Sequence, residues 1–379
     1  MQSDKQLPRR RFLKATASLG AGVAAGLTPT RADAALASLA AAGKAGEGKP
    51  EKRNAQEGIL YKRLGRTNFM VSALSFGGVG MNESSLPVFD QSVGRGVNFI
   101  MAHGGSCTKV LGKWFQTKGN RERIFLGLQG GVGNIDRALK TMGTDHVDLL
   151  MMCSHKPDGV GNESIRRQFE ALKKAGKARY LCLVFHSNLP AVWKEGVKAG
   201  WYDALLAPYA MPSRKDLKPL IASAKAKDIG LLTMKAARAL PKGTDFVAAG
   251  RTFLADGMAT VLKTMRKPND LKKYMPLAAK AGAKLAQIDC AGQCTLCGAC
   301  SPCPAGVAIQ DILRTYQYYV RDLGWMDRAC RQYAAIGLGA LAPACTDCGQ
   351  CEDVCPQHLP IRQLIREAHV ELELELARG

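Results

Sequence analysis

The sequence predicts an α/β protein in which a (β/α)8 barrel is followed by a small, mostly helical module. Between residues 61 and 271, short apolar runs alternate with helical, lysine-bearing stretches, a pattern typical of buried parallel strands joined by helices. The composition then changes, because no lysine follows Lys284 and eight of the remaining cysteines form two tight runs. With 379 residues and 46% hydrophobic side chains, the chain is long enough for two cores.

The N-terminal residues resemble a twin-arginine signal peptide. Residues 8–14 carry paired arginines before Phe-Leu-Lys, and a weakly hydrophobic stretch, residues 15–27, follows. Small residues around Ala34 predict cleavage after it, so residues 1–34 form the signal peptide. We therefore expect export, as a folded protein, to the periplasm or beyond. The alternative is a basic, amphipathic start of a cytoplasmic protein.

The rest of the chain divides into three predicted segments. Residues 35–57, rich in alanine, glycine, lysine and glutamate, are expected to form a flexible linker. Residues 58–285 are the predicted barrel, and residues 286–379 are the C-terminal module. The eight apolar runs that we assign to the barrel strands are residues 72–76, 99–102, 124–128, 147–152, 180–185, 204–207, 230–234 and 260–262.

The positive charge is concentrated in the predicted linker and barrel. Residues 35–285 carry a formal net charge of +21, whereas residues 286–379 carry −4. A solvated lysine surface explains this charge; a docking face for an acidic redox partner or an anionic surface is the alternative. The lysines are scattered and no basic motif interleaved with aromatic residues occurs, so nucleic-acid binding is not predicted. No run of about 18 apolar residues occurs, so we predict no integral membrane segment.

The two cysteine runs predict the chemistry of the C-terminal module. Their spacings are C-x2-C-x2-C-x2-C-P and C-x2-C-x2-C-x3-C-P. Three closely spaced thiolates can bind three irons of one [4Fe-4S] cluster, while the proline turns the fourth cysteine toward the other cluster. We therefore expect two [4Fe-4S] clusters with crossed ligands, one held by Cys294, Cys297, Cys300 and Cys355 and the other by Cys345, Cys348, Cys351 and Cys303.

A disulfide framework and a pair of zinc sites are the alternatives. Four cysteines within ten residues would pair among themselves only with strained loops, and zinc needs two CxxC pairs rather than a third cysteine after each pair. The first run has x2 where bacterial ferredoxins usually have x3, which leaves the role of Cys303 open. Cys330 falls outside both runs, and we expect it to be buried in a broken helix over residues 308–335.

Several phrases in the predicted barrel resemble the aldo/keto reductase family, and the second cysteine run resembles its iron-sulfur branch. They include Gly-Val-Asn-Phe at 96–99, Gly-Thr-Asp-His-Val-Asp at 143–148 and Gly-Lys-Ala-Arg-Tyr at 176–180. The resemblance implies a TIM barrel in which hydride passes from NADPH to a carbonyl. It also implies a tyrosine acid at the barrel mouth, tuned by lysine, aspartate and histidine.

The catalytic positions depart from that family pattern. Met101 stands in place of the aspartate, Gln129 in place of the lysine and Cys153 in place of the histidine, and residues 102–106 contain no tyrosine. General acid catalysis needs a group within hydrogen-bond reach of the carbonyl oxygen. We therefore assign no catalytic residue.

Four residues match positions that face a nicotinamide dinucleotide in the family. The resemblance assigns Tyr209 to stacking on the nicotinamide ring, Lys235 to the pyrophosphate, and Arg266 and Lys267 to the neighbourhood of a 2′-phosphate. A half-buried aromatic and surface cations are the alternative explanation, and we favour it. A dinucleotide held by its phosphates alone would leave its reactive end unpositioned, which argues against NADP(H) as a working cofactor. The residues at the amide-binding positions are Val184, Phe185 and Leu206.

Three functions remain open. The first is an exported electron-transfer protein with a catalytically degenerate barrel and an unidentified redox partner. It best explains why the cysteines are intact while the family's catalytic tyrosine, lysine, aspartate and histidine are missing. An oxidoreductase that acts on a small-molecule substrate at the barrel mouth, with electrons from the clusters, is the second. NADPH-dependent carbonyl reduction is the third. A transition metal at the mouth is a further speculation, on His103, Cys107, Cys153, His155, Cys182 and His186.

Overall fold

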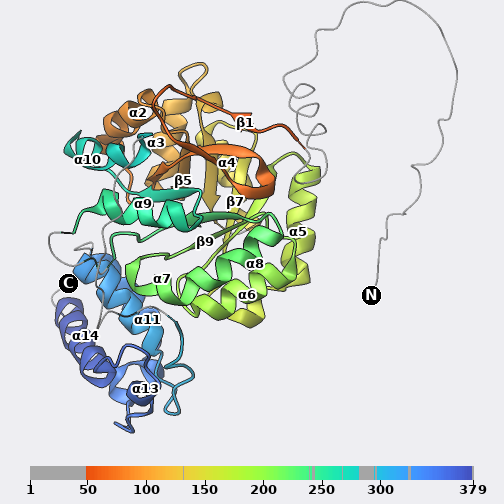
Figure 1. Cartoon of the computed structure of the whole chain (residues 1–379). Coiled ribbons are helices and arrows are strands. Elements are labelled where there is room, and N and C mark those ends of the chain that lie inside the picture. Colours follow the sequence, from red (N-terminus) through yellow and green to blue (C-terminus); the bar gives the residue numbers. More distant parts are fainter. Residues whose placement is uncertain are drawn as a thin grey trace, which may run out of the picture.

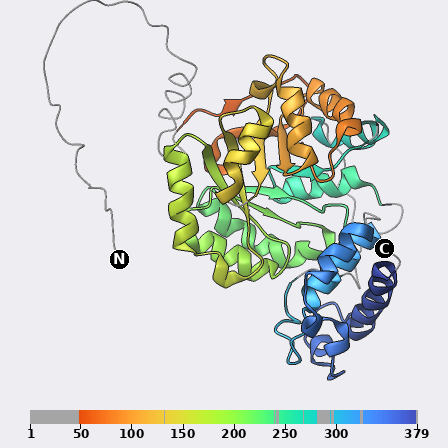
Figure 2. The ribbon, with the colours of Figure 1, turned by 180° about the vertical axis from the view of Figure 1, so that it is seen from behind.

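The computed structural model describes residues 48–130, 132–238, 240, 244–266, 268–280, 294, 297–322 and 326–377. The predicted signal peptide, Lys267 and the predicted boundary at residue 285 lie outside the described residues. Figures 1 and 2 show, from opposite sides, a barrel with a smaller helical C-terminal domain at one end of it.

Eight strands close into a barrel in the order β10-β11-β4-β5-β6-β7-β8-β9. Every neighbouring pair is parallel, so all eight carboxyl ends open at the same mouth. This confirms the predicted (β/α)8 barrel. The strands are β4 (Leu74–Gly77), β5 (Phe99–His103), β6 (Phe125–Gln129), β7 (Val147–Cys153), β8 (Ala178–Val184), β9 (Ala204–Ala207), β10 (Gly230–Thr233) and β11 (Thr260–Lys263).

Helices cover the outside of the barrel (Figure 1). In α6, for example, the buried residues recur at helical spacing from Leu189 through Trp193 to Val197, so one apolar stripe faces the core. The helices are α2 (Leu86–Gly94), α3 (Ser106–Phe115), α4 (Ile135–Met142), α5 (Glu163–Lys174), α6 (Leu189–Ala199), α7 (Met211–Leu217), α8 (Ile221–Ala226), α9 (Phe246–Asp256) and α10 (Pro268–Tyr274).

A three-stranded sheet closes the amino-terminal end of the barrel. It consists of β1 (Glu51–Lys52), β3 (Phe69–Ser72) and β2 (Tyr61–Arg63) in that order. The ring of Phe69 stacks on Phe125 inside the barrel, with ring centroids 4.3 Å apart. The prediction of a flexible linker over residues 35–57 is therefore wrong at its C-terminal end, because β1 is part of this sheet. The first predicted barrel strand, residues 72–76, is divided between β3 and β4.

A buried carboxylate explains why this end of the predicted linker is ordered. Asp148 in β7 is fully buried, and its Oδ2 accepts a hydrogen bond from the backbone N–H of Leu126, 2.8 Å away. Guanidinium nitrogens of Arg53, Arg121 and Arg179 lie 3.0, 2.9 and 2.9 Å from its oxygens. Arg53 comes from the predicted linker, so the charge of Asp148 anchors that segment to the barrel.

The C-terminal domain is mostly helical, as predicted. The predicted helix over residues 308–335 is present in pieces: α11 (Ile309–Arg314) continues into a π-helix (Thr315–Asp322), which precedes α12 (Met326–Ala334). Two further helices, α13 (Gln350–Asp353) and α14 (Ile361–Leu376), complete it. Cys330 is buried in the core of this domain, as expected. Within the described part of the chain, no helix is both long and apolar enough to cross a bilayer.

Candidate functional site

The structure brings the eight cysteines of the two runs together in two cavities of the C-terminal domain. The first cavity is lined by Cys294, Cys297, Cys300 and Cys355, and the second by Cys303, Cys345, Cys348 and Cys351. These are the two crossed sets that the spacing predicts. Cys300 also lines the second cavity, so the two cavities adjoin at this residue.

Glycines give the cysteine loops their curvature. Gly298 and Gly349 each follow the second cysteine of a run, and both have positive φ, +91° and +78°. Residues other than glycine rarely adopt this conformation. It turns the chain between the second and third cysteines of each run, so that both face the same cavity.

The electrostatics of the thiols agree with this grouping. Burial, followed by the charges of Cys294, Cys297 and Cys355, raises the pKa of Cys300 to about 12. Burial also raises the pKa of Cys351, with Cys345 and Cys303 among its charged neighbours. Thiols held this close resist joint ionisation unless cations compensate their charge, and iron ions supply such compensation.

The donor set fits [4Fe-4S] clusters. All eight thiols are free of disulfides, and among the described residues no histidine or carboxylate lines either cavity. Four thiolates are the usual ligands of such a cluster. The backbone N–H of Asp347 points to Sγ of Cys345 at 3.4 Å, a contact of the kind that tunes a cluster's potential.

Barrel side chains contact the wall of the first cavity directly. Arg238, which follows β10, donates from Nη1 to the backbone oxygen of Cys294 at 2.8 Å and from Nη2 to Oε1 of Gln317 at 2.5 Å. Asn188, after β8, exchanges two hydrogen bonds of 2.9 Å with Gln310, which lines the first cavity. The first cavity therefore faces the barrel mouth.

Gly298 permits this close approach, and its replacement tests the interface. A Cβ on Gly298 would lie 2.5 Å from Oδ1 of Asn188, so Gly298→Ala is expected to weaken the contact by about 1–3 kcal/mol. Iron should then leave the first cluster several-fold faster when a chelator is added, as followed by cluster absorbance. Gly306→Ala is the matched control, because φ is +74° there and no atom lies within 4 Å. Equal rates of iron loss from the two variants would contradict a close contact between Gly298 and Asn188 at this interface.

A separate cavity, the mouth cavity, lies at the carboxyl ends of the barrel strands. It has a volume of about 480 Å³ and is lined by the carboxyl ends of the strands, together with Tyr319 and Arg328 of the C-terminal domain. Met101 and Gln129, which replace the family's catalytic aspartate and lysine, both line it. Nε2 of Gln129 donates to Sγ of Cys153 at 2.8 Å.

The residues predicted to face a dinucleotide do not all line the mouth cavity. Lys235 and Arg266 line the mouth cavity. Tyr209 does not, because its side chain is completely buried, with its hydroxyl donating to Oδ2 of Asp256 at 2.8 Å and its ring packed edge-on against Phe253. Its ring therefore has no face open for stacking on a nicotinamide, contrary to our assignment. Lys267 lies outside the described residues.

Histidines of the mouth are uncharged at neutral pH. Burial, together with the charge of Arg328, lowers the pKa of His103 to about 4. Burial, followed by the charges of Lys235 and Arg314, holds the pKa of His186 well below its ordinary value. In the part of the chain that the structure describes, no three His, Cys, Asp or Glu side chains converge to hold a single metal ion, so the structure gives no support to a transition metal at the mouth.

Among the residues of these sites that sequence reasoning missed, three join the two domains. Arg238 bridges the mouth and the first cluster cavity, and Tyr319 and Arg328 reach the mouth from the other domain. Arg238 could have been noticed because it follows a predicted strand end. Nothing in the sequence near Tyr319 or Arg328 indicates that they face the barrel.

Comparisons with known proteins agree with both parts of the fold. Residues 293–359 match the family described as the 4Fe-4S dicluster domain. A Pseudomonas aeruginosa protein provisionally named an aldo-keto reductase shares the barrel fold at 24% identity and a TM-score of 0.50, over 58% of this chain and 95% of its own. An aldo-keto reductase from Bacillus halodurans does so at 17% identity and a TM-score of 0.51, over 60% and 93%. No curated protein matches the chain. The chain thus joins a barrel with the aldo-keto reductase fold to a C-terminal 4Fe-4S dicluster domain.

Proposed function

We propose that this chain is an exported iron-sulfur protein that transfers electrons through two [4Fe-4S] clusters, with a barrel that has lost carbonyl reductase chemistry. The observation that carries the proposal is the pair of cysteine-lined cavities that adjoin at Cys300. Bound clusters would supply one-electron transfer, and adjacent sites favour exchange between them.

The residues around the two cavities give them different surroundings. The first cavity is covered by the barrel through Arg238 and Asn188. The second is more open, because Cys348 is exposed and Val354, which lines the same cavity, is 53% exposed. We infer that a redox partner protein docks over Cys348 and exchanges electrons there.

Export is supported by the N-terminal sequence alone. The paired arginines within residues 8–14, the following apolar stretch and the small residues at Ala32 and Ala34 are typical of the twin-arginine route. Nicotinamide nucleotides are not expected to be freely supplied outside the cytoplasm. Export therefore agrees with the changes at Met101 and Gln129 and with the buried ring of Tyr209.

A second candidate function has a specific observation in its favour. The mouth cavity of about 480 Å³ lies within the usual size range of small-molecule sites. Arg238 lines it and also hydrogen-bonds to the backbone of the cluster ligand Cys294. An oxidoreductase that exchanges electrons between the first cluster and a small substrate at the mouth fits this arrangement.

Reduction by two different donors tests the proposal. We expect anaerobically purified protein to contain about eight irons and eight sulfides per chain, and to give a coupled two-cluster EPR spectrum after reduction with dithionite. NADPH should not reduce it, because the mouth has no open aromatic ring at Tyr209 to position a nicotinamide. An iron content of about half this value would contradict the two-cluster assignment. Reduction by NADPH would favour carbonyl reduction as the function instead.

A further inference from the structure

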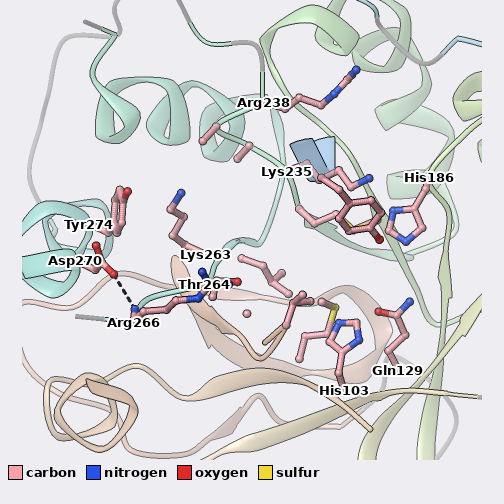
Figure 3. A pocket seen from close by; sticks show the side chains of 18 of the residues that line it. His103, Gln129, His186, Lys235, Arg238, Lys263, Thr264, Arg266, Asp270 and Tyr274 are labelled. Carbon is pink, nitrogen blue, oxygen red and sulfur yellow. Dashed lines mark hydrogen bonds between the residues drawn. The ribbon is translucent and has the colours of Figure 1, made fainter. Parts of the chain in front are cut away.

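The mouth cavity is strongly cationic. Five of the described side chains that line it are positively charged. Asp270 is the one carboxylate among the described lining residues. Oδ2 of Asp270 accepts a hydrogen bond of 2.7 Å from the backbone N–H of Arg266 (Figure 3). A cavity with this excess of positive charge attracts anions. The cations are Lys235, Arg238, Lys263, Arg266 and Arg328.

The cations stand on more than one side of the cavity. Figure 3 shows Lys263 and Arg266 on one side and Lys235, beside His186, on the other. Arg328 approaches from the C-terminal domain, where its guanidinium lies 5.1 Å from the ring centre of Tyr319. Charges spread in this way fit a ligand with two separated anionic groups better than one with a single compact charge.

The lining of the cavity also includes apolar side chains and uncharged polar ones. Met101, Met234 and Leu262 supply the apolar part. The rings of His103 and His186 also line the cavity. Apolar side chains suit a carbon skeleton rather than bare phosphate.

The geometry points to a composite site for a small organic dianion, such as a dicarboxylate, formed by the barrel mouth and completed by Arg328 and Tyr319 of the cluster-binding domain. Its size fits, because about 480 Å³ accommodates a small molecule and excludes a macromolecule. Binding needs no redox step, so this inference goes beyond the proposed electron transfer and stands or falls separately from it.

Calorimetric titration of the anaerobic, cluster-loaded protein at low salt tests the site, with succinate as the probe. Arg328→Gln is expected to weaken succinate binding at least tenfold, since a hydrogen bond between charged groups in such a site typically contributes that much. Arg331→Gln is the matched control: it removes the same charge from the same helix, α12, at an exposed position that does not line the cavity. It should bind succinate as the unaltered protein does.

Two further probes separate the alternatives. Uncharged succinamide and inorganic phosphate should each bind at least tenfold more weakly than succinate, because one lacks charge and the other lacks a carbon skeleton. Lys235→Gln, on the barrel side, provides a second variant if Arg328→Gln fails to retain its clusters, as judged by absorbance. The site is disproved if succinate does not bind, if both arginine variants bind alike, or if phosphate binds as tightly. Displacement of succinate by micromolar NADPH would assign the cavity to a dinucleotide instead.

Discussion

Replacing Cys355 with serine is expected to abolish the cluster held by the first cysteine run while leaving the other in place. Cys355 belongs to the second run in sequence, yet it lines the cavity of Cys294, Cys297 and Cys300. A [4Fe-4S] cluster depends on four thiolates, so the variant should retain about four irons of about eight. Iron analysis and EPR of the reduced protein measure this loss, and the coupling between two spins should disappear.

The reciprocal variant makes the test specific to the crossed arrangement. Cys303→Ser should remove the cluster of the second run, and its remaining EPR spectrum should differ from that of Cys355→Ser. Cys330→Ser is the control, because Cys330 is buried in the same domain and lines neither cavity. If Cys355→Ser instead destroyed the signal of the second cluster, the ligand sets would be uncrossed and our assignment would be wrong.

The barrel strands could be predicted because each is a short, mostly buried and mostly apolar run. Residues 204–207 and 230–233 are buried along their whole length, as expected for parallel strands covered on both faces. The same reasoning failed at residues 72–76, where Ala73 lies between two strands. A continuous apolar run does not reveal where the chain leaves one sheet and enters another.

The predicted linker failed for a different reason. Residues 51–57 are polar or charged except for Ala55, so composition alone indicates a flexible segment. Their order depends on partners distant in sequence, since Arg53 pairs with Asp148 and β1 pairs with β3. The composition of a segment does not indicate which distant residues will pair with it.

The two sites differ in how far the sequence predicts them. The cysteine sets follow from the spacing, since three closely spaced thiols of a run share a cavity and the fourth, before a proline, reaches the cavity of the other run. Tyr209 was misassigned because the resemblance gives its place in the chain but not the packing of Phe253 and Asp256 around it. Arg328 contributes to the mouth only through docking of the two domains, which no local pattern encodes.

Replacing Asp148 with asparagine is expected to be the most destabilising of the conservative changes in the barrel. The change preserves the shape of the side chain but leaves Arg53, Arg121 and Arg179 without their shared charge. Removing one partner from a buried ion pair typically costs about 3–5 kcal/mol. Urea unfolding of the anaerobic protein, followed by circular dichroism, should show a loss of this size in the free energy of unfolding. Asp145→Asn should cost less than about 0.5 kcal/mol, because that carboxylate is exposed and forms an ion pair with the neighbouring His146 at the surface.

The pH dependence separates a charge effect from simple loss of packing. Burial raises the pKa of Asp148, but Arg121, Arg53 and Arg179 together outweigh it and hold the pKa well below its usual range. A carboxyl whose pKa is lower in the folded than in the unfolded chain stabilises the fold above its unfolded pKa of about 4 and loses that contribution only as the pH falls further. The difference in stability between the unaltered protein and Asp148→Asn should therefore stay constant from pH 8 to about pH 5. A difference that already declined between pH 7 and pH 5 would mean that Asp148 takes up a proton in the folded protein, and that the arginines do not hold its charge.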